Sequence, residues 1–246
     1  MPYALDLDGV IWLADEPIAG AAEAVRRLRA AGEPILFVTN NSSQPVEDVE
    51  AELARHGIEA RGDVVTSALA VAHLVAPGER VLLCAGEGVR RALLAVGAVP
   101  VREGPADAVV VGLHLDFDYE RLRAAAGAVR DGARLLATND DATYPTPSGP
   151  IPGGGAILAA VERASGVLAT IAGKPHPPMA DLVRDRLGPT GTMVGDRPDT
   201  DGRFARALGY RFALVLSGVT EGNDAAVPAD EVAPDLAALV DRLAHC

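Results

Sequence analysis

Short apolar runs alternate along the chain with amphipathic segments. Runs such as residues 34–40 have the length and the β-branched and aromatic content of buried strands, whereas Ala-, Leu- and Arg-rich segments repeat apolar residues at helical spacing. The pattern predicts strands at 3–7, 34–40, 63–67, 80–86, 98–101, 107–113, 133–139, 192–196 and 211–218, and helices at 20–32, 45–57, 87–97, 119–132, 155–166, 179–188 and 201–209. Alternation of this kind predicts an α/β fold with parallel strands.

Proline and glycine residues interrupt the series of predicted strands and helices at several places. A Pro- and Gly-dense stretch at 143–155 predicts a loop, and Pro77-Gly78 and Gly173-Pro175 mark expected crossing points. We therefore predict a doubly wound, Rossmann-like parallel-sheet core with a second α/β domain inserted into it. The predicted ranges are 1–76 plus 173–246 for the core and 77–172 for the inserted domain.

Composition and charge narrow the class of protein. The 246 residues include 34 acidic and 22 basic ones, a net charge of −12. Nucleic acid and anionic membranes are bound by basic faces, so we expect neither as a partner. No apolar stretch reaches the length of a membrane span, the N-terminus lacks the layout of a signal peptide, and the two cysteines offer no disulfide framework. We expect a globular protein of the reducing cytoplasm.

Two carboxylates stand at the end of the first predicted strand, in the sequence LDLDG at residues 5–9. Residues i and i+2 of a strand point the same way, so Asp6 and Asp8 can address one site. In open parallel sheets such a site lies beyond the carboxyl ends of the strands. The motif alone fits equally well a strand that runs into a turn, with Asp8 and Gly9 as turn residues.

Three further polar clusters also follow predicted strands or crossing points: TNNSS at 39–43, Lys174, which is the only lysine of the chain, and VGDRPDTD at 194–201. Each has a simpler interpretation. TNNSS could cap a helix, Lys174 could be an exposed charge in a linker, and VGDRPDTD could be a solvated acidic loop. Taken together they meet at one edge of one sheet. Clustered carboxylates suit Mg²⁺, and hydroxyl, amide and lysine groups suit phosphoryl oxygens.

The ordered set LDLDGVIW, TNNSS, GKP and VGDRPDTD resembles the four signature motifs of the haloacid dehalogenase-like (HAD) hydrolase superfamily. Its details look like the NagD-like, p-nitrophenyl phosphatase-like branch (subfamily IIA), and residues 137–166 are similar to part of that branch's C2-type α/β cap. The resemblance implies a Mg²⁺-dependent phosphatase that hydrolyses a small phosphate monoester through an aspartyl-phosphate intermediate. It also implies a homodimer.

The resemblance assigns the catalytic and metal-binding residues. Asp6 matches the nucleophile, and Asp8 matches the general acid and base. Asp6, the backbone carbonyl of Asp8, and Asp196 match the Mg²⁺ ligands, with Asp201 as a supporting carboxylate. Gly9 would let the backbone approach the phosphate closely.

The resemblance also assigns the residues that contact substrate. In the cap, Asp141 and Tyr144 match positions near the specificity loop, although either residue could instead shape that loop. A sugar, glycerol, nucleotide or pyridoxal phosphate remains open as substrate. The matched phosphate-binding residues are Thr39, Asn40, Asn41 and Lys174.

Two other functions use part of the same chemistry. A receiver-like signalling module stores a phosphoryl group on an aspartate, but such modules are nearer the size of one small domain and lack an inserted cap. A phosphotransferase or mutase shares the first half-reaction and differs in its product. We rank both below the phosphatase.

Overall fold

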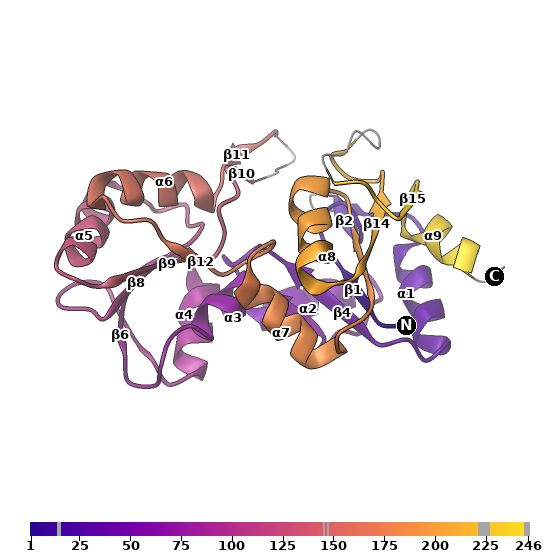
Figure 1. Cartoon of the computed structure of the whole chain (residues 1–246), viewed down its shortest axis with the longest axis horizontal. Helices are drawn as coiled ribbons and strands as arrows, with labels where there is room; N and C mark the ends of the chain where they lie inside the picture. Colours follow the sequence, from indigo (N-terminus) through magenta and orange to yellow (C-terminus); the bar gives the residue numbers. More distant parts are fainter. Residues whose placement is uncertain (14–15, 145, 147, 221–226, 244–246) are drawn as a thin grey trace. The chain divides into compact units, whose positions relative to one another are not determined.

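The computed structural model describes residues 1–13, 16–144, 146, 148–220 and 227–243 (Figure 1). The chain separates into two compact units. The first comprises Met1–Thr39, Glu47–Val65 and Lys174–Cys246, and the second comprises Asn40–Val46 and Thr66–Gly173. Compared with the predicted ranges, residues 40–46, 66–76 and 173 group with the second unit. The chain therefore passes between the units within two of the predicted motifs, TNNSS and GKP.

A six-stranded sheet with the order β15-β14-β13-β1-β4-β5 forms the centre of the first unit. Its strands are β1 (Tyr3–Leu5), β4 (Ile35–Thr39), β5 (Val64–Thr66), β13 (Thr192–Gly195), β14 (Arg211–Val215) and β15 (Glu231–Ala233). β1 pairs in parallel with both β13 and β4. All five residues of β4 are buried, as expected for a parallel strand covered on both faces.

Helices cover this sheet. They are α1 (Ala21–Ala30), α2 (Val46–Arg55), α7 (Pro177–Leu187), α8 (Arg203–Leu208) and α9 (Leu236–Leu243). α1 packs with α9, and α7 packs with α8 (Figure 1). The chain proceeds from β1 toward β4 and from β13 toward β14 in opposite directions across the sheet. Right-handed crossovers therefore place α1 and α8 on opposite faces, and the predicted doubly wound fold is confirmed.

The second unit is built on a five-stranded parallel sheet with the order β12-β9-β8-β6-β7. Its strands are β6 (Arg80–Cys84), β7 (Val99–Val101), β8 (Ala108–Val111), β9 (Arg134–Ala137) and β12 (Thr170–Ile171), and its helices are α3 (Ser67–Ala72), α4 (Glu87–Ala95), α5 (Tyr119–Arg130) and α6 (Gly154–Ser165). α5 and α6 lie side by side (Figure 1). Val109, Val111, Leu135 and Val161 belong to the core between sheet and helices.

The structure corrects several predicted elements. The stretch 143–155, predicted as a loop, contains the antiparallel pair β10 (Thr143–Tyr144) and β11 (Ile151–Pro152). The helix predicted at 201–209 begins only at Arg203, after a π-helical turn at Pro198–Gly202. The pair β2 (Trp12–Leu13) and β3 (Glu16–Pro17) was not predicted, because two-residue strands show no periodicity. β12 also has only two residues and was missed for the same reason, and α3, β15 and α9 were missed as well.

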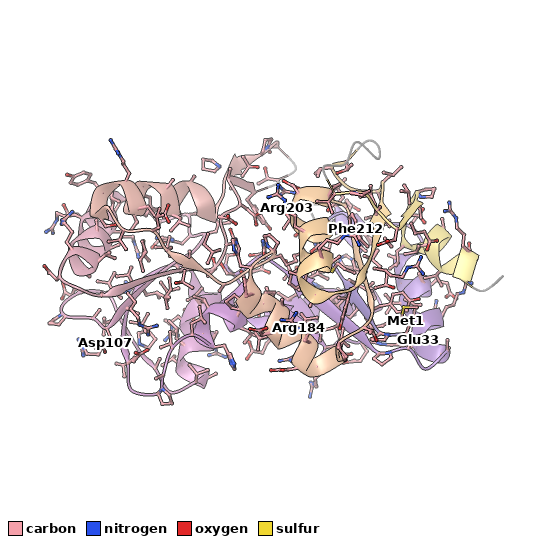
Figure 2. The ribbon with its side chains drawn as sticks, viewed as in Figure 1. Met1, Glu33, Asp107, Arg184, Arg203 and Phe212 are labelled. Carbon is pink, nitrogen blue, oxygen red and sulfur yellow. The ribbon has the colours of Figure 1, made fainter. Side chains whose placement is uncertain are left out.

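Figure 2 shows the side chains of the described residues on the ribbon of Figure 1. Phe212 of β14 is fully buried, and the ammonium of Met1 forms an ion pair with Glu33 (Figure 2). Cys84 is buried, whereas Cys246 lies outside the described residues. Among the described residues, every helix is too short or too polar to cross a lipid bilayer.

Candidate active site

Three neighbouring strands of the first unit end in polar residues at one edge of the sheet. Asp6 follows β1, Thr39 ends β4 and Asp196 follows β13. The backbone N–H of Asp6 still continues the ladder and donates to Val194 O at 2.9 Å. All three residues are buried. Because β1 lies between β4 and β13, the sheet order itself brings these side chains to one place.

Lys174 joins this group from the segment before α7. Its Nζ donates to Asp6 Oδ1 at 2.7 Å and to Asp201 Oδ1 at 2.8 Å. The Lys174 side chain is only 2% exposed, and Asp201 is held on the π-helical turn, where its Oδ2 also accepts from the backbone N–H of Arg197. The lysine is thus a buried bridge between two carboxylates rather than an exposed linker charge.

The charge of the cluster is unbalanced. Carboxylate oxygens of Asp6, Asp196 and Asp201 all lie within 4.8 Å of one another. Three negative charges against the single positive charge of Lys174 leave a net charge of minus two at full ionisation. Buried charges need compensation, and a divalent cation with a preference for oxygen ligands supplies the missing two charges. The residues therefore fit Mg²⁺.

The imbalance also appears in the acid–base properties of the group. Burial, followed by the neighbouring Asp201, raises the pKa of Asp6 well above its ordinary value, and the same two causes raise the pKa of Asp196 to about 7. Burial alone would lower the pKa of Lys174, but Asp201 and Asp6 outweigh it and raise that pKa. Lys174 therefore remains charged at neutral pH, and the raised pKa values of Asp6 and Asp196 mean that protons compete with a metal ion for these two carboxylates.

Two glycines enclose the Asp196 carboxylate. A Cβ on Gly9, whose φ is +80°, would lie 2.5 Å from Asp196 Cγ, and one on Gly218 would lie 2.0 Å from Asp196 Oδ2. The backbone N–H of Val219 donates to Asp196 Oδ2 at 2.8 Å, and Ser217 Oγ donates to Gly9 O at 2.7 Å. Sequence reasoning missed residues 217–219, although they follow β14 at the same sheet edge, which is the signal that identified the other clusters.

This enclosure gives a first prediction. Gly218→Ala places a methyl group where the Asp196 carboxylate now lies, so that carboxylate must move. We expect the affinity for Mg²⁺ to fall by about ten- to a hundredfold, the range seen when groups that orient a ligand are changed. Isothermal titration calorimetry with Mg²⁺ measures this affinity. The matched control is Gly127→Ala in α5, where a Cβ meets nothing within 4 Å; unchanged affinity in Gly218→Ala would contradict the prediction.

Asp8 lies beside Asp6 in sequence but in a different environment. It is half-buried, and Trp12 Nε1 donates to Asp8 Oδ1 at 3.1 Å. Burial raises the pKa of Asp8, while the hydrogen bond from Trp12 opposes that rise. The indole of Trp12 therefore helps to fix the position of the Asp8 carboxylate.

The other predicted site residues lie in the second unit. Asn40 Nδ2 donates to Asp141 Oδ2 at 2.9 Å, and Asn41 Nδ2 donates to Tyr144 Oη at 3.3 Å. The predicted phosphate-binding asparagines and the predicted specificity residues therefore form one cluster within that unit. Asp199, the remaining acidic residue of VGDRPDTD, is exposed and pairs with Arg197.

Comparison with known proteins agrees with this geometry. Residues 3–99 match the family model described as haloacid dehalogenase-like hydrolase, and residues 171–239 match the model described as HAD-hydrolase-like. The chain is 41% identical over 229 residues to a D-glycerol 3-phosphate phosphatase of Mycobacterium tuberculosis, covering 90% of this chain but only 64% of that protein. It is 40% identical to an acid sugar phosphatase of Staphylococcus saprophyticus, covering 81% and 80% of the two chains.

Solved structures of related phosphatases have the same fold as this chain. The glycerol phosphate phosphatase of M. tuberculosis in complex with magnesium superposes with a TM-score of 0.90 at 37% identity, over 97% of this chain and 75% of that one. A 4-nitrophenylphosphatase of Thermotoga maritima gives a TM-score of 0.90 at 32% identity, over 98% and 96% of the two chains. With the strand-end carboxylates and the buried lysine, these similarities show that the chain belongs to the haloacid dehalogenase-like hydrolases, in their NagD-like, p-nitrophenyl phosphatase-like branch.

Proposed function

We propose that this protein is a Mg²⁺-dependent phosphatase that hydrolyses a small phosphate monoester through an aspartyl-phosphate intermediate. The observation that carries the proposal is the ion-paired group of Asp6, Lys174 and Asp201 beside Asp196, with its excess of two negative charges. A structural ion pair in a core has no need of a third buried carboxylate. A site that receives a divalent cation and a phosphate does.

In the proposed reaction, the carboxylate of Asp6 attacks the phosphorus and displaces the leaving-group oxygen, which takes a proton from Asp8. Asp8 then accepts a proton from the water that cleaves the aspartyl-phosphate, releasing phosphate and restoring Asp6. The raised pKa of Asp8 supports its role as the acid of the first step. Lys174 holds Asp6 in place and stabilises negative charge on the phosphoryl oxygens.

Mg²⁺ would be held by Asp6, Asp196 and the backbone carbonyl of Asp8, and when bound it supplies positive charge that offsets repulsion between a carboxylate and a phosphate dianion. Asp201 orients Lys174. Thr39, at the end of β4, and the two residues that follow it provide the hydroxyl and amides for the remaining phosphoryl oxygens. Asp196 is ionised fully only above a pH of about 7 without the cation, so protons compete with Mg²⁺ at lower pH.

The class of substrate follows from the relatives. One is described as a D-glycerol 3-phosphate phosphatase and another as an acid sugar phosphatase. Both descriptions name a phosphate monoester of a small polyhydroxy compound. Glycerol phosphates and sugar phosphates are therefore the substrates to test before nucleotides and pyridoxal phosphate.

A phosphate-release assay tests this function. With Mg²⁺ present, we expect inorganic phosphate to be released from at least one member of a panel of glycerol, sugar, nucleotide and pyridoxal phosphates. Chelation of the metal should remove the activity, and fresh Mg²⁺ should restore it. Turnover that chelation leaves unchanged would contradict the proposed metal dependence, and transfer of the phosphoryl group to a second sugar instead of water would identify a phosphotransferase.

A further inference from the structure

Three residues of the second unit form a closed ring of hydrogen bonds. Asn40 Nδ2 donates to Asp141 Oδ2 at 2.9 Å, the backbone N–H of Asp141 donates to Asn139 Oδ1 at 3.2 Å, and Asn139 Nδ2 donates to Asn40 O at 2.8 Å. Asn139 is 5% exposed, and Asn40 and Asp141 are half-buried. The segment that carries Asn40 is thereby tied to the loop 139–144 by both its side chain and its backbone.

The ring fixes which way the Asn40 amide points. An ionised carboxylate only accepts hydrogen bonds, so the NH₂ group of Asn40 must face Asp141 and its oxygen must face the other way. On that other side a Cβ added to Gly173 would lie 2.6 Å from Asn40 Oδ1, so only a glycine leaves room there. Ser67 Oγ donates to Asn40 O at 2.6 Å and completes the support. Rotation of the amide would lose the bond to Asp141.

The loop that supplies Asp141 packs closely against the start of α6. The N–H of Gly155, at the start of α6, donates to Asp141 O at 2.9 Å. A Cβ on Gly153 would lie 2.4 Å from that same oxygen, and a Cβ on Gly155 would lie 2.3 Å from Asp140 O. The close approach of loop 139–144 thus explains the GGG sequence at the start of α6, and the hydrogen bond from Gly155 holds the backbone of Asp141 there.

A parallel arrangement holds Asn41. Its Oδ1 accepts from both the backbone N–H of Ser43 at 3.0 Å and Ser43 Oγ at 2.7 Å, and its Nδ2 donates to Tyr144 Oη at 3.3 Å. The two residues that the resemblance places at a specificity loop therefore make contacts of the same kind. Each accepts a hydrogen bond from an asparagine of the segment after Thr39.

We propose that Asp141 and Tyr144 are positioning residues, which orient the amides of Asn40 and Asn41 for the phosphoryl group rather than selecting the leaving group. This inference rests on the proposed phosphatase function. It has a consequence that a specificity role does not have. Because the phosphoryl group is the same in every substrate, loss of either contact lowers the rate for all substrates by the same factor.

The test is a double-mutant cycle on Asn40 and Asp141, with kcat and KM measured for a glycerol phosphate, a sugar phosphate and p-nitrophenyl phosphate. We expect Asp141→Ala to lower kcat/KM by about ten- to a hundredfold for all three, the scale of one lost hydrogen bond to a charged group. Asp141→Asn, which keeps an acceptor oxygen, should recover most of the loss. In the Asn40→Ala background, Asp141→Ala should add almost nothing, because Asp141 then has no amide to orient.

The remaining variants separate this inference from the function on which it rests. Tyr144→Phe should give a smaller loss, also independent of substrate, and exposed Asp131→Ala in the same unit serves as the control for expression and thermal stability. Losses that differ between leaving groups, or that multiply in the double variant, would assign Asp141 to the substrate and overturn the inference. Asp6→Asn is assayed in parallel: if it keeps the wild-type rate, the phosphatase mechanism itself fails, whatever the cycle gives.

Discussion

Asp6→Asn should lower phosphatase turnover at least about a thousandfold for every substrate, the scale of loss when a nucleophile is removed. An amide cannot form the proposed aspartyl-phosphate, although its oxygen can still accept from Lys174 Nζ, which lies 2.7 Å from Asp6 Oδ1. The variant should therefore remain folded. Steady-state phosphate release with saturating Mg²⁺ measures the loss, and acid-quenched labelling with a radioactive phosphate ester measures the phosphoenzyme.

Stability gives this variant a second readout. Asp6→Asn removes one negative charge from a buried group that carries two in excess, so the metal-free variant should unfold at the same temperature as the wild type or higher. The matched control is Asp185→Asn on the exposed surface of α7, which should leave turnover unchanged. Wild-type turnover in Asp6→Asn would exclude Asp6 as the nucleophile.

Lys174→Met should produce the largest loss of stability. The substitution removes the ammonium between Asp6 and Asp201 and leaves three buried carboxylates with no cation. Breaking a buried ion pair by removing one partner costs about 3–5 kcal/mol, and we expect the free energy of unfolding of the metal-free protein to fall by this amount at pH 8. Activity should also be lost, because Asp6 then loses its ion pair with Lys174. Chemical denaturation followed by circular dichroism measures the first effect.

The loss of unfolding free energy caused by Lys174→Met should depend on pH. The folded-state pKa values of Asp6 and Asp196 lie above the ordinary carboxyl value of 3.8, so the folded protein binds more protons than the unfolded chain. This extra proton binding stabilises the folded protein at low pH. The stabilisation is lost as the pH rises through the folded-state pKa, which is about 7 for Asp196. Because Lys174 lowers both pKa values, its removal raises them further, and the variant should recover toward the wild type at pH 5.

A control substitution isolates the buried charge. Arg61→Met removes one positive charge from an exposed position of the same unit. It should change the free energy of unfolding by only a few tenths of a kcal/mol at either pH, as surface substitutions do. If Lys174→Met were equally mild, or if its deficit were the same at pH 5 and pH 8, the charge imbalance would not be what Lys174 relieves.

Periodicity predicted the long elements well, because each has enough residues to show its repeat. The segment 34–40 contains β4 (Ile35–Thr39), and 119–132 contains α5 (Tyr119–Arg130). The parallel-sheet rule then placed Asp6 and Asp196 at one edge, and in the structure their carboxylates lie within 4.8 Å. The two-residue strands β2, β3, β10, β11 and β12 could not be predicted, since they owe their geometry to neighbouring segments and not to a local pattern.

Contacts between segments that are distant in the sequence could not be predicted from the sequence pattern. Nothing in the pattern around Gly218 indicated that a Cβ there would meet Asp196, and nothing around Asp141 indicated Asn40 as its partner, because both depend on how loops fold back. The chain also passes to the second unit after Thr39, returns for Glu47–Val65, leaves again at Thr66 and returns at Lys174. Proline and glycine indicated only the last of these crossings. Composition marks where a chain can turn, but packing decides where one unit ends.

The single lysine has a consequence for chemical modification. Lys174 is the only lysine in the sequence, and its side chain is 2% exposed and bonded to two carboxylates. Acylating or alkylating reagents that target lysine therefore find no accessible ε-amine in the folded protein. Modification at this position becomes a reporter of local opening, and its rate measures how often the interior of the catalytic group meets solvent.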